Sequence, residues 1–349
     1  MFVLSSWDMA KPTFPIMKTH ALVCFDNQKI TLEPVTLAAP SGGQILVRTK
    51  YSGVSVGTEF ALIRNRISWG PYPLVTGYQA VGEVEVVGAD VRDYRVGDLV
   101  YYRANHGEMT LSSGVTCTNV SGTHASHAIV TVGDSVALLP AAVSPRVASL
   151  FVMPAVGLHG ADKAQPGVGD VVVVVGAGLI GLGAVNALAN RGCRVVVTDV
   201  DDTRLAMATE LGALHVCNVK TASVRELLEK LKPGGADAVF ECTGIPEQIT
   251  PAMELCRVHG TFVYQGNYGA APYSSLFLPA HNRQLTCHYP CDDGGPECRA
   301  AVLRLMASKG LPWEKTITHE VDASGAAEFY NAINRGGVAN LVAGVIKWE

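Results

Sequence analysis

The chain has 349 residues, of which 48% are hydrophobic and 17% are charged, and its net charge is −4. This length exceeds one ordinary core and suits two packed domains. The sequence has no long basic run, which excludes a protein built to bind nucleic acid or anionic membranes. The most apolar run, residues 171–182, is too short to span a bilayer, and the N-terminus has no signal-peptide pattern, so we expect a cytoplasmic protein.

Nine scattered cysteines predict reduced thiols rather than a disulfide framework.

The first part of the chain predicts β-strands. Four runs rich in β-branched residues are separated by Gly, Pro, Asp and Asn. These runs are "KTHALVCF", "QILVRTKYSGVSV", "QAVGEVEVVG" and "HAIVTV". We therefore expect an antiparallel β domain from residue 20 to about residue 150.

From about Pro154 onward, strand-like runs alternate with helix-like runs, beginning with "DVVVVVGA" and "LIGLGAVNALANRG". Continuous apolar strands in this alternation predict a parallel sheet that is covered on both faces and doubly wound. Further along, "PECRAAVLRLMASKG" and "SGAAEFYNAINRGG" predict helices, the second capped by Ser324. The last residues, "NLVAGVIKWE", predict a final strand.

A glycine pattern follows the run of five valines and opens a helix. Gly176, Gly178 and Gly181 form G-x-G-x-x-G, which in a strand–turn–helix context predicts a dinucleotide site. The first helical turn, with Leu179 and Ile180, supplies free N–H groups for the phosphates. The alternative is that these glycines serve packing alone.

Asp199 lies at the end of the next predicted strand, eighteen residues after Gly181. An acidic residue there accepts hydrogen bonds from a ribose 2′-hydroxyl and repels a 2′-phosphate, so we expect NAD rather than NADP. Arg204 is within reach and is expected to stack on the adenine or to be solvated. The alternative reading is that Asp199 only caps a helix.

Two later segments each end a predicted strand on the same sheet edge, "FECTG" at residues 240–244 and "VYQGN" at residues 263–267. Ligands bind at the carboxyl ends of parallel strands. The cofactor-binding candidates here are Cys242, Thr243, Gln265, Gly266 and Asn267. The alternative for both segments is an ordinary strand-end turn.

The order of "SGVSVGTE", "GYQAVGEVEVVG", "VGDLVYY" and the glycine pattern resembles the medium-chain dehydrogenase/reductase superfamily over nearly the whole chain. The resemblance implies an α/β protein with an N-terminal GroES-like β-barrel domain and a doubly wound Rossmann domain. We place the catalytic domain at residues 1–152, the Rossmann domain at 153–290, and a C-terminal segment that returns to the catalytic domain at 291–349. The family resemblance also implies a homodimer in which the Rossmann sheets of two copies pair edge to edge.

The sequence departs from this family at the metal ligands. Zinc-dependent members have a Cys where this chain has Ser55, and a Gly-His-Glu triplet where it has Gly77, Tyr78 and Gln79. The segment for the third ligand, "FVMPAVG", has neither Cys nor an acid, and the structural-zinc region at 103–121 contains only Cys117. Serine, tyrosine and glutamine are poor zinc ligands, so we expect no metal. The pattern resembles the zinc-free branch that includes bacteriochlorophyllide a dehydrogenase.

Other potential metal ligands are Cys287, His288, Cys291 and Cys298, and His124 with His127. Adjacent residues of a strand point to opposite faces, so Cys287 and His288 are not expected to share a metal. His159 is expected to pack at the domain junction. His281 and Arg283 fall where related proteins line the cleft or contact phosphate.

Three residues are the catalytic candidates, because an alcohol needs a group that takes its proton or stabilises its oxyanion. The family resemblance implies that Thr58 contacts the substrate hydroxyl and relays its proton. Glu59 is expected to act as a base or to orient Tyr78, and Tyr78 occupies the former His position with a phenol that can donate to an alkoxide. Structural roles are the alternative for all three.

The function that follows is a zinc-independent, NAD-dependent oxidoreductase that interconverts a secondary alcohol and a ketone. A cyclitol, a sugar derivative or a hydroxyalkyl-bearing ring would fit as the small-molecule substrate. One alternative is a zinc-free quinone or enone reductase that adds hydride to a conjugated C=C bond. The other is a non-catalytic protein that binds NAD(H).

Overall fold

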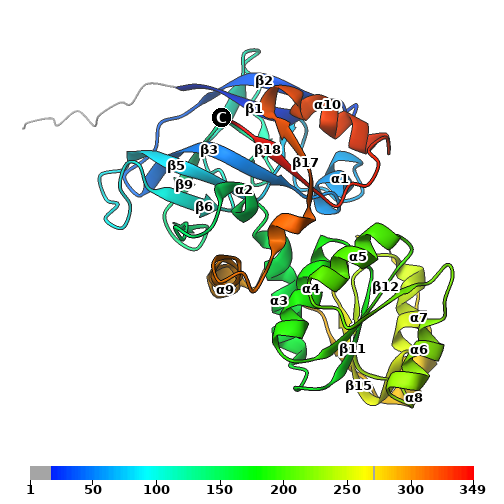
Figure 1. The fold of residues 1–349 in the computed structure, drawn as a ribbon. Coiled ribbons are helices and arrows are strands. Elements are labelled where there is room, and N and C mark those ends of the chain that lie inside the picture. The colour runs from blue at the N-terminus through cyan, green and yellow to red at the C-terminus, as the bar shows by residue number, and fades with distance from the viewer. Residues whose placement is uncertain (1–16, 270–271) are drawn as a thin grey trace, which may run out of the picture.

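A computed structural model describes residues 17–269 and 272–349 (Figure 1). The N-terminal part is a β-barrel, as predicted. Its strands are β1 (Met17–Cys24), β2 (Ile30–Leu37), β3 (Gln44–Val54), β4 (Leu74–Val75), β5 (Ala80–Val87), β6 (Leu99–Tyr102), β7 (Met109–Leu111), β8 (Thr118–Asn119), β9 (His127–Thr131) and β10 (Val136–Leu138). One sheet has the order β7-β2-β1-β4-β8, and in the other β3 pairs with both β5 and β9. The pairings are antiparallel except for β4 with β8.

The C-terminal segment completes the second barrel sheet. Its elements are β17 (Ile317–Asp322), α10 (Ala323–Asn334) and β18 (Ala343–Lys347), and β18 pairs antiparallel with β3, Gly344 opposite Val54. The predicted cap at Ser324 is wrong. The N-cap of α10 is Asp322, and Ser324 lies inside the first turn, because the helix begins directly where β17 ends.

The Rossmann sheet has six parallel strands in the order β13-β12-β11-β14-β15-β16. They are β11 (Val171–Val175), β12 (Arg194–Asp199), β13 (His215–Asn218), β14 (Ala236–Glu241), β15 (Cys256–Tyr264) and β16 (Thr286–His288). The helices are α4 (Leu179–Asn190), α5 (Asp202–Glu210), α6 (Val224–Leu231), α7 (Ile249–Met253) and α8 (Phe277–Arg283). The five valines of β11 are all buried because alternate side chains enter the two cores on opposite faces of the sheet. The predicted doubly wound sheet is confirmed.

The strand order reverses between β11 and β14, so the loops that follow these two strands run in opposite directions along the sheet. Open α/β sheets bind ligands at such a topological switch point. This edge of the sheet faces the barrel lobe in Figure 1. The architecture therefore brings the predicted nucleotide turn and the predicted catalytic loop to the same junction.

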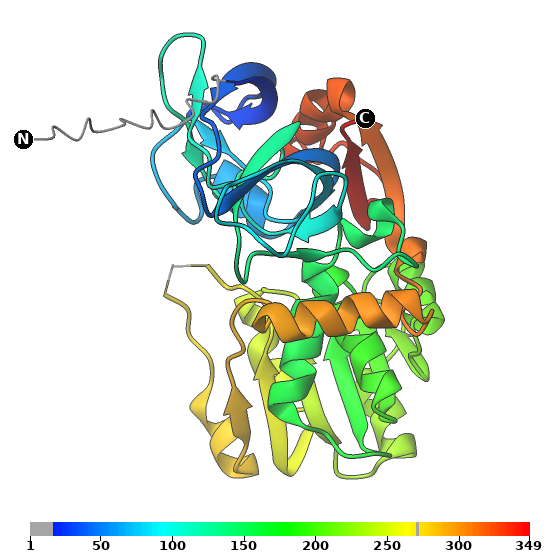
Figure 2. The same ribbon diagram turned by 90° about the vertical axis from the view of Figure 1, so that its left-hand side faces the viewer.

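Two long helices occupy the junction between the lobes, α3 (Val152–Ala164) and α9 (Gly295–Ala307) (Figure 2). Helix α3 crosses α4 closely, since a Cβ on Gly157 would lie 2.2 Å from the backbone N of Ala184. The remaining short helices are α1 (Thr58–Ile63), α2 (Pro145–Ala148), η1 (Pro246–Gln248) and η2 (Trp313–Thr316). The divisions at 152/153 and 290/291 stay predictions. Among the described helices, none has both the length and the apolarity to cross a bilayer.

Candidate active site

Tyr78 and Ser55 meet in the barrel wall at the positions where the resembled family has metal ligands. The Tyr78 hydroxyl donates a hydrogen bond to Ser55 Oγ, and Met153 Sδ of α3 lies 3.8 Å from the same hydroxyl. Thr58, the first residue of α1, is half-buried, and its side chain is near enough to lower the pKa of Tyr78. Burial raises the pKa of Tyr78 to about 12, so the phenol is protonated at neutral pH and acts as a hydrogen-bond donor.

Glu59 makes its hydrogen bonds within a buried cluster formed with Ser55, His124 and Tyr330, and none of these bonds is to the Tyr78 hydroxyl. Its Oε1 accepts from the backbone N of Ser55 at 2.8 Å, and its Oε2 lies 2.9 Å from His124 Nε2 and accepts from the Tyr330 hydroxyl at 2.8 Å. Glu59 and His124 are both fully buried. No direct hydrogen bond from Glu59 to Tyr78 is among these contacts: Ser55 occupies Oε1, and the remote residues His124 and Tyr330 occupy Oε2, so the expected orienting role stays a prediction.

His124 therefore has a role that its spacing from His127 did not indicate. Its Nδ1 lies 2.8 Å from Ser52 Oγ, which also accepts a hydrogen bond from the indole N–H of Trp348. Gly77 allows this approach, since it has φ +87° and a Cβ there would lie 2.6 Å from the His124 ring. His127, the first residue of β9, instead has its Nε2 3.4 Å from Oε2 of Glu85 in β5.

The donor set at the family's metal position does not fit zinc. Gln79 is fully buried, and its amide is engaged by the backbone: Oε1 accepts from the N–H of Val152 at 3.0 Å. The other potential metal ligands at this position are the neutral phenol of Tyr78, the hydroxyl of Ser55 and the thioether of Met153. The contacts of these three groups described above include no thiolate, imidazole or carboxylate, which are the ligands that zinc prefers. Across residues 17–269 and 272–349, no three His, Cys, Asp or Glu side chains are grouped so that they could hold a metal ion.

The glycine turn has the shape of a phosphate cradle. Gly176 has φ +95°, and a Cβ on Gly181 would lie 2.0 Å from the carbonyl oxygen of Gly176, so this glycine is needed for helix packing. Gly178 is the N-cap of α4 without a side-chain cap, and a Cβ there would have only Arg204 Nη1 nearby, at 3.9 Å. Leu179 and Ile180 form the half-buried first turn. The open face at Gly178 fits a pyrophosphate on the helix N-terminus.

Asp199 holds the turn rather than capping a helix. Its Oδ2 accepts from the N–H of Ala177 at 2.7 Å and its Oδ1 from that of Val200 at 2.7 Å. The cap of α5 is Asp201, which accepts from the backbone N–H of Arg204 at 3.3 Å. The guanidinium of Arg204 donates to the carbonyl of Leu341 at 3.1 Å and so spans from the Rossmann domain to the C-terminal segment.

The strand ends after β14 and β15 meet beside this turn. Cys242 is half-buried, and burial raises the pKa of its thiol well above the ordinary value. Thr243 donates both its backbone N–H and its hydroxyl to Glu241, a fully buried carboxylate that also accepts from Tyr268. Sequence reasoning missed Glu241, because an acid at the end of an apolar strand gave no signal beyond the turn after it.

The β15 candidates differ in exposure. Gln265 is buried against α3, donating to the carbonyl of Val156 at 3.2 Å, and a Cβ on Gly160 would lie 1.7 Å from its Oε1. Gly266 is half-buried, and Asn267 is exposed with its Oδ1 bonded to the N–H of Gly269. Of these, Gly266 and Asn267 are the more accessible to a ligand at the sheet edge.

The remaining candidates divide between the junction and the far end of the sheet. His159 packs against the segment before α9, where a Cβ on Gly294 would lie 2.6 Å from its Nδ1. Arg283 donates to the carbonyl of Cys256 at 3.0 Å, at the amino end of β15, and His281 stacks on Phe277. Arg283 and His281 are therefore not placed with the glycine turn, because Arg283 is bonded at the amino end of β15 and the turn lies at the carboxyl ends of the strands.

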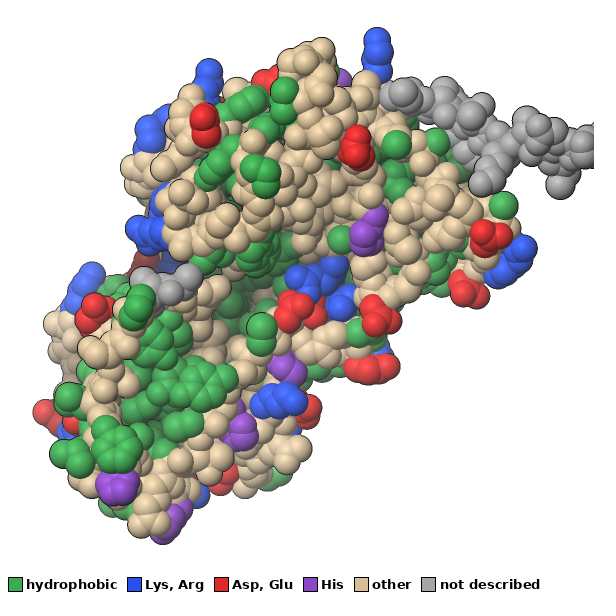
Figure 3. Space-filling model, turned by 180° about the vertical axis from the view of Figure 1, so that it is seen from behind, with side chains coloured by type: hydrophobic (Ala, Val, Ile, Leu, Met, Phe, Trp, Pro, Cys, Tyr) green, Lys and Arg blue, Asp and Glu red, His purple; other side chains and the backbone are tan. Residues whose placement is uncertain are grey.

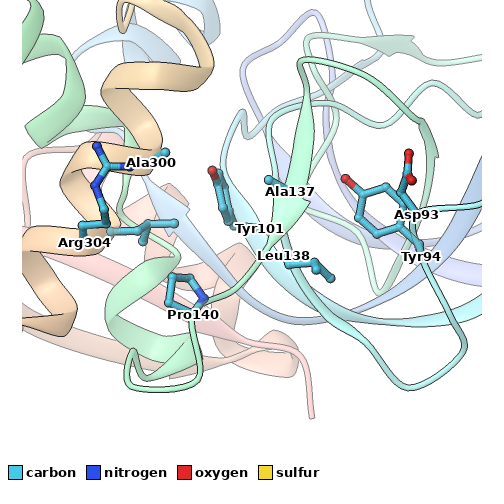
Figure 4. Close-up of a pocket in the computed structure, with 9 residues that line it drawn as sticks. Asp93, Tyr94, Tyr101, Ala137, Leu138, Pro140, Ala300 and Arg304 are labelled. Atoms are coloured by element: carbon cyan, nitrogen blue, oxygen red, sulfur yellow. The ribbon is translucent and has the colours of Figure 1, made fainter.

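The cysteines near β16 do not form a cluster with His288. Cys287 and Cys291 are exposed, whereas Cys298 is half-buried in α9 near Gly294. A separate groove of about 440 Å³ lies between α9 and the barrel, lined by Tyr94, Tyr101, Leu138 and Arg304 among others (Figure 4). It contains none of the predicted catalytic or cofactor residues.

Comparison with known proteins agrees with this geometry. Residues 41–141 match the alcohol dehydrogenase GroES-like domain family, and residues 180–308 match the zinc-binding dehydrogenase family. The chain is 26% identical over 314 residues to a sorbitol dehydrogenase of Halalkalibacterium halodurans, covering 85% of this chain and 90% of that protein.

Solved structures share the fold over 95% of the chain. A zinc-binding dehydrogenase from Sinorhizobium meliloti 1021 bound to NADP has a TM-score of 0.81 at 20% identity, covering 95% of this chain and 100% of that chain. An alcohol dehydrogenase from Escherichia coli CFT073 complexed with NADH has a TM-score of 0.80 at 19% identity, covering 95% and 99%. With the barrel, the Rossmann sheet and both domain families in the same order, the chain belongs to the medium-chain dehydrogenase/reductase superfamily and is an alcohol dehydrogenase-like oxidoreductase.

Proposed function

We propose that this protein is a zinc-independent, NAD-dependent dehydrogenase that interconverts a secondary alcohol, of the polyol or cyclitol class, and its ketone. One observation carries the proposal: the positions of the family's metal ligands hold a protonated, buried Tyr78 that is hydrogen-bonded to Ser55. The sorbitol dehydrogenase relative supports the substrate class. The donor chemistry at this position supports membership of a zinc-free branch.

The residues that would hold the cofactor are those of the open glycine turn and the adjoining strand ends. Gly178 and the first turn of α4 suit the pyrophosphate, and Asp199, already fixed by three backbone N–H groups, suits a ribose 2′-hydroxyl. A carboxylate at that place disfavours the 2′-phosphate of NADP. When bound, a nicotinamide ring accepts or returns the hydride.

The protein's own groups then handle the proton and the oxygen charge. During ketone reduction the Tyr78 phenol donates a hydrogen bond to the oxygen on which negative charge develops. The phenol has one proton, so when it turns from Ser55 to the substrate oxygen, the Ser55 hydroxyl donates in its place to the phenol oxygen and holds its orientation, while Thr58 offers a second hydroxyl for proton transfer. Glu59 acts indirectly. Its carboxylate accepts a hydrogen bond from the backbone N–H of Ser55 and so fixes the loop that carries the Ser55 and Thr58 hydroxyls.

The test is oxidation of a panel of secondary alcohols, including sorbitol and inositols, by purified protein treated with chelator and checked for metal content. We expect NADH formation at 340 nm with NAD, a lower rate with NADP, and no loss of activity after chelation. Reduction of enones with NADPH, and no alcohol oxidation, would favour the C=C reductase. Tight NADH binding without turnover on any substrate would favour a non-catalytic protein.

We also propose a homodimer formed through β16. This strand lies at the end of the sheet order, and exposed apolar side chains surround it: Tyr289 is 67% exposed and Phe277 is 70% exposed. Figure 3 shows a continuous apolar patch on the Rossmann lobe. Such a patch beside an open strand edge favours pairing with a second copy. Light scattering coupled to size exclusion tests this, and a monomer mass would refute it.

A further inference from the structure

Arg103 lies directly over the proposed catalytic tyrosine. Its guanidinium carbon is 5.7 Å from the centroid of the Tyr78 ring, within the range of a cation–π contact. Arg103 follows β6, and its side chain is 19% exposed. Two charged side chains influence the pKa of Tyr78: the carboxylate of Glu59, from α1, and the guanidinium of Arg103. Arg103 is the positively charged one of the two.

Two aspartates from the segment between β16 and α9 hold this guanidinium. Arg103 Nη1 donates to Asp292 Oδ1 at 2.6 Å and to Asp293 Oδ2 at 2.9 Å. Asp293 is 1% exposed, and its Oδ2 also lies 2.9 Å from Nε of Arg299 in α9, whose Nη1 donates to the carbonyl of Asp134 in the barrel. The cluster therefore joins the barrel to the chain that leaves the Rossmann sheet.

The backbone around the aspartates is shaped to bring them there. Gly294 and Gly295 have φ values of +72° and +81°, and a Cβ on Gly294 would collide with His159 of α3 and with Cys298. In addition, the N–H of Gly295 donates to Asp293 Oδ1 at 3.0 Å, which fixes the carboxylate. Arg103 is thus clamped on one nitrogen by a rigid turn.

We propose that Arg103 is a positioning residue for Tyr78: clamped by Asp292 and Asp293, its guanidinium covers the phenol ring and supplies the positive charge beside the reacting oxygen. This inference rests on the proposed catalytic role of Tyr78. Because the clamp comes from the interdomain segment, it also links the placement of the two lobes to the tyrosine.

The electrostatic sign agrees with this role. Burial, the strongest influence, and the charge of Glu59 raise the pKa of Tyr78, whereas the charge of Arg103 lowers it. A phenol of lower pKa is the better donor to a developing oxyanion. Burial lowers the pKa of Arg103, but the neighbouring carboxylates of Asp293 and Asp292 more than offset this and raise the pKa, so Arg103 stays charged. The uncharged analogue of Arg103 should therefore leave a weaker acid at Tyr78.

The experiment compares Arg103→Gln, Arg103→Lys and Asp293→Asn with wild type, and uses Arg225→Gln as the control. Arg225 pairs with Glu254 on the surface of the Rossmann domain, so its loss removes a similar ion pair far from Tyr78. For each protein we measure kcat and KM for alcohol oxidation with NAD, the Kd of NADH by fluorescence, and the thermal unfolding curve. A fluorotyrosine-labelled sample gives the titration of Tyr78 by ¹⁹F NMR, with the resonance assigned by its absence from Tyr78→Phe.

We expect Arg103→Gln to lower kcat by roughly tenfold to a hundredfold, no more than the loss of a whole proton donor. Its Kd for NADH should be unchanged, the pKa of residue 78 should rise, and Arg103→Lys should restore most of both values. Arg225→Gln should match wild type. The proposal is overturned if Arg103→Gln leaves the ¹⁹F titration unchanged, or if it raises KM for the alcohol alone, which would mean that Arg103 binds substrate. If wild type oxidises no alcohol, the proposed function fails, while the titration still tests the effect of Arg103.

Discussion

Replacing Tyr78 with Phe isolates the one atom on which the proposed chemistry depends. The ring is almost fully buried and packs in the large core cluster that joins the two lobes, and Phe keeps that packing. The change removes the hydrogen bond to Ser55 and leaves the Ser55 hydroxyl without its donor. A buried hydrogen bond of this kind contributes about 0.5–1.5 kcal/mol to stability. The fold should therefore survive with a slightly lower Tm.

The effect on catalysis should be much larger. A positioned acid–base group contributes on the order of 10²–10⁴-fold to a reaction rate. We expect kcat for alcohol oxidation to fall within that range, whereas the Kd of NADH stays the same because the glycine turn is on the other domain. Stopped-flow NADH formation in one turnover, together with a fluorescence titration of NADH, separates the two quantities.

Tyr102→Phe is the matched control for this variant. Tyr102→Phe removes another fully buried hydroxyl, which bonds to Thr49 at 2.7 Å in the barrel and takes no part in the proposed site. This variant should lose comparable stability and keep its kcat. If Tyr78→Phe retains wild-type kcat, or if both variants lose activity equally, a catalytic role for the phenol is refuted.

Three further outcomes follow from the geometry. Gly181→Ala puts a Cβ 2.0 Å from the carbonyl of Gly176 and should cost about 1–3 kcal/mol in unfolding free energy, with weaker NADH binding, as measured by denaturation and fluorescence titration. Glu59→Ala removes the shared acceptor of the Ser55 N–H and the Tyr330 hydroxyl beside His124 and should cost about 1–3 kcal/mol, as urea unfolding will show; Glu59→Gln keeps an acceptor oxygen and should cost less, and equal losses would argue against these hydrogen bonds as the cause. Asp199→Asn should reduce the NAD over NADP preference in kcat/KM by about tenfold, and an unchanged ratio would remove Asp199 from cofactor selection.

Local patterns in the sequence were sufficient for the architecture. The alternation of apolar strands and helices, the five buried valines and the glycine turn depend on neighbours a few residues apart, so the Rossmann sheet and the place of its glycine turn could be predicted. Even so, a local signal can mislead at an element boundary. The residue Ser324 has the right type for a cap, but α10 starts one residue before it because β17 continues directly into the helix.

The contacts that define the site were decided by the tertiary structure alone. Glu59 meets His124 and Tyr330, and Arg103 meets Asp293, across separations in the chain of 65, 271 and 190 residues. No periodicity carries such information, because it depends on how the C-terminal strands complete the barrel and how the segment before α9 crosses the junction. Composition and spacing determined which side chains were available. Only the packing of the two lobes determined which charged side chains lie near the proposed catalytic tyrosine.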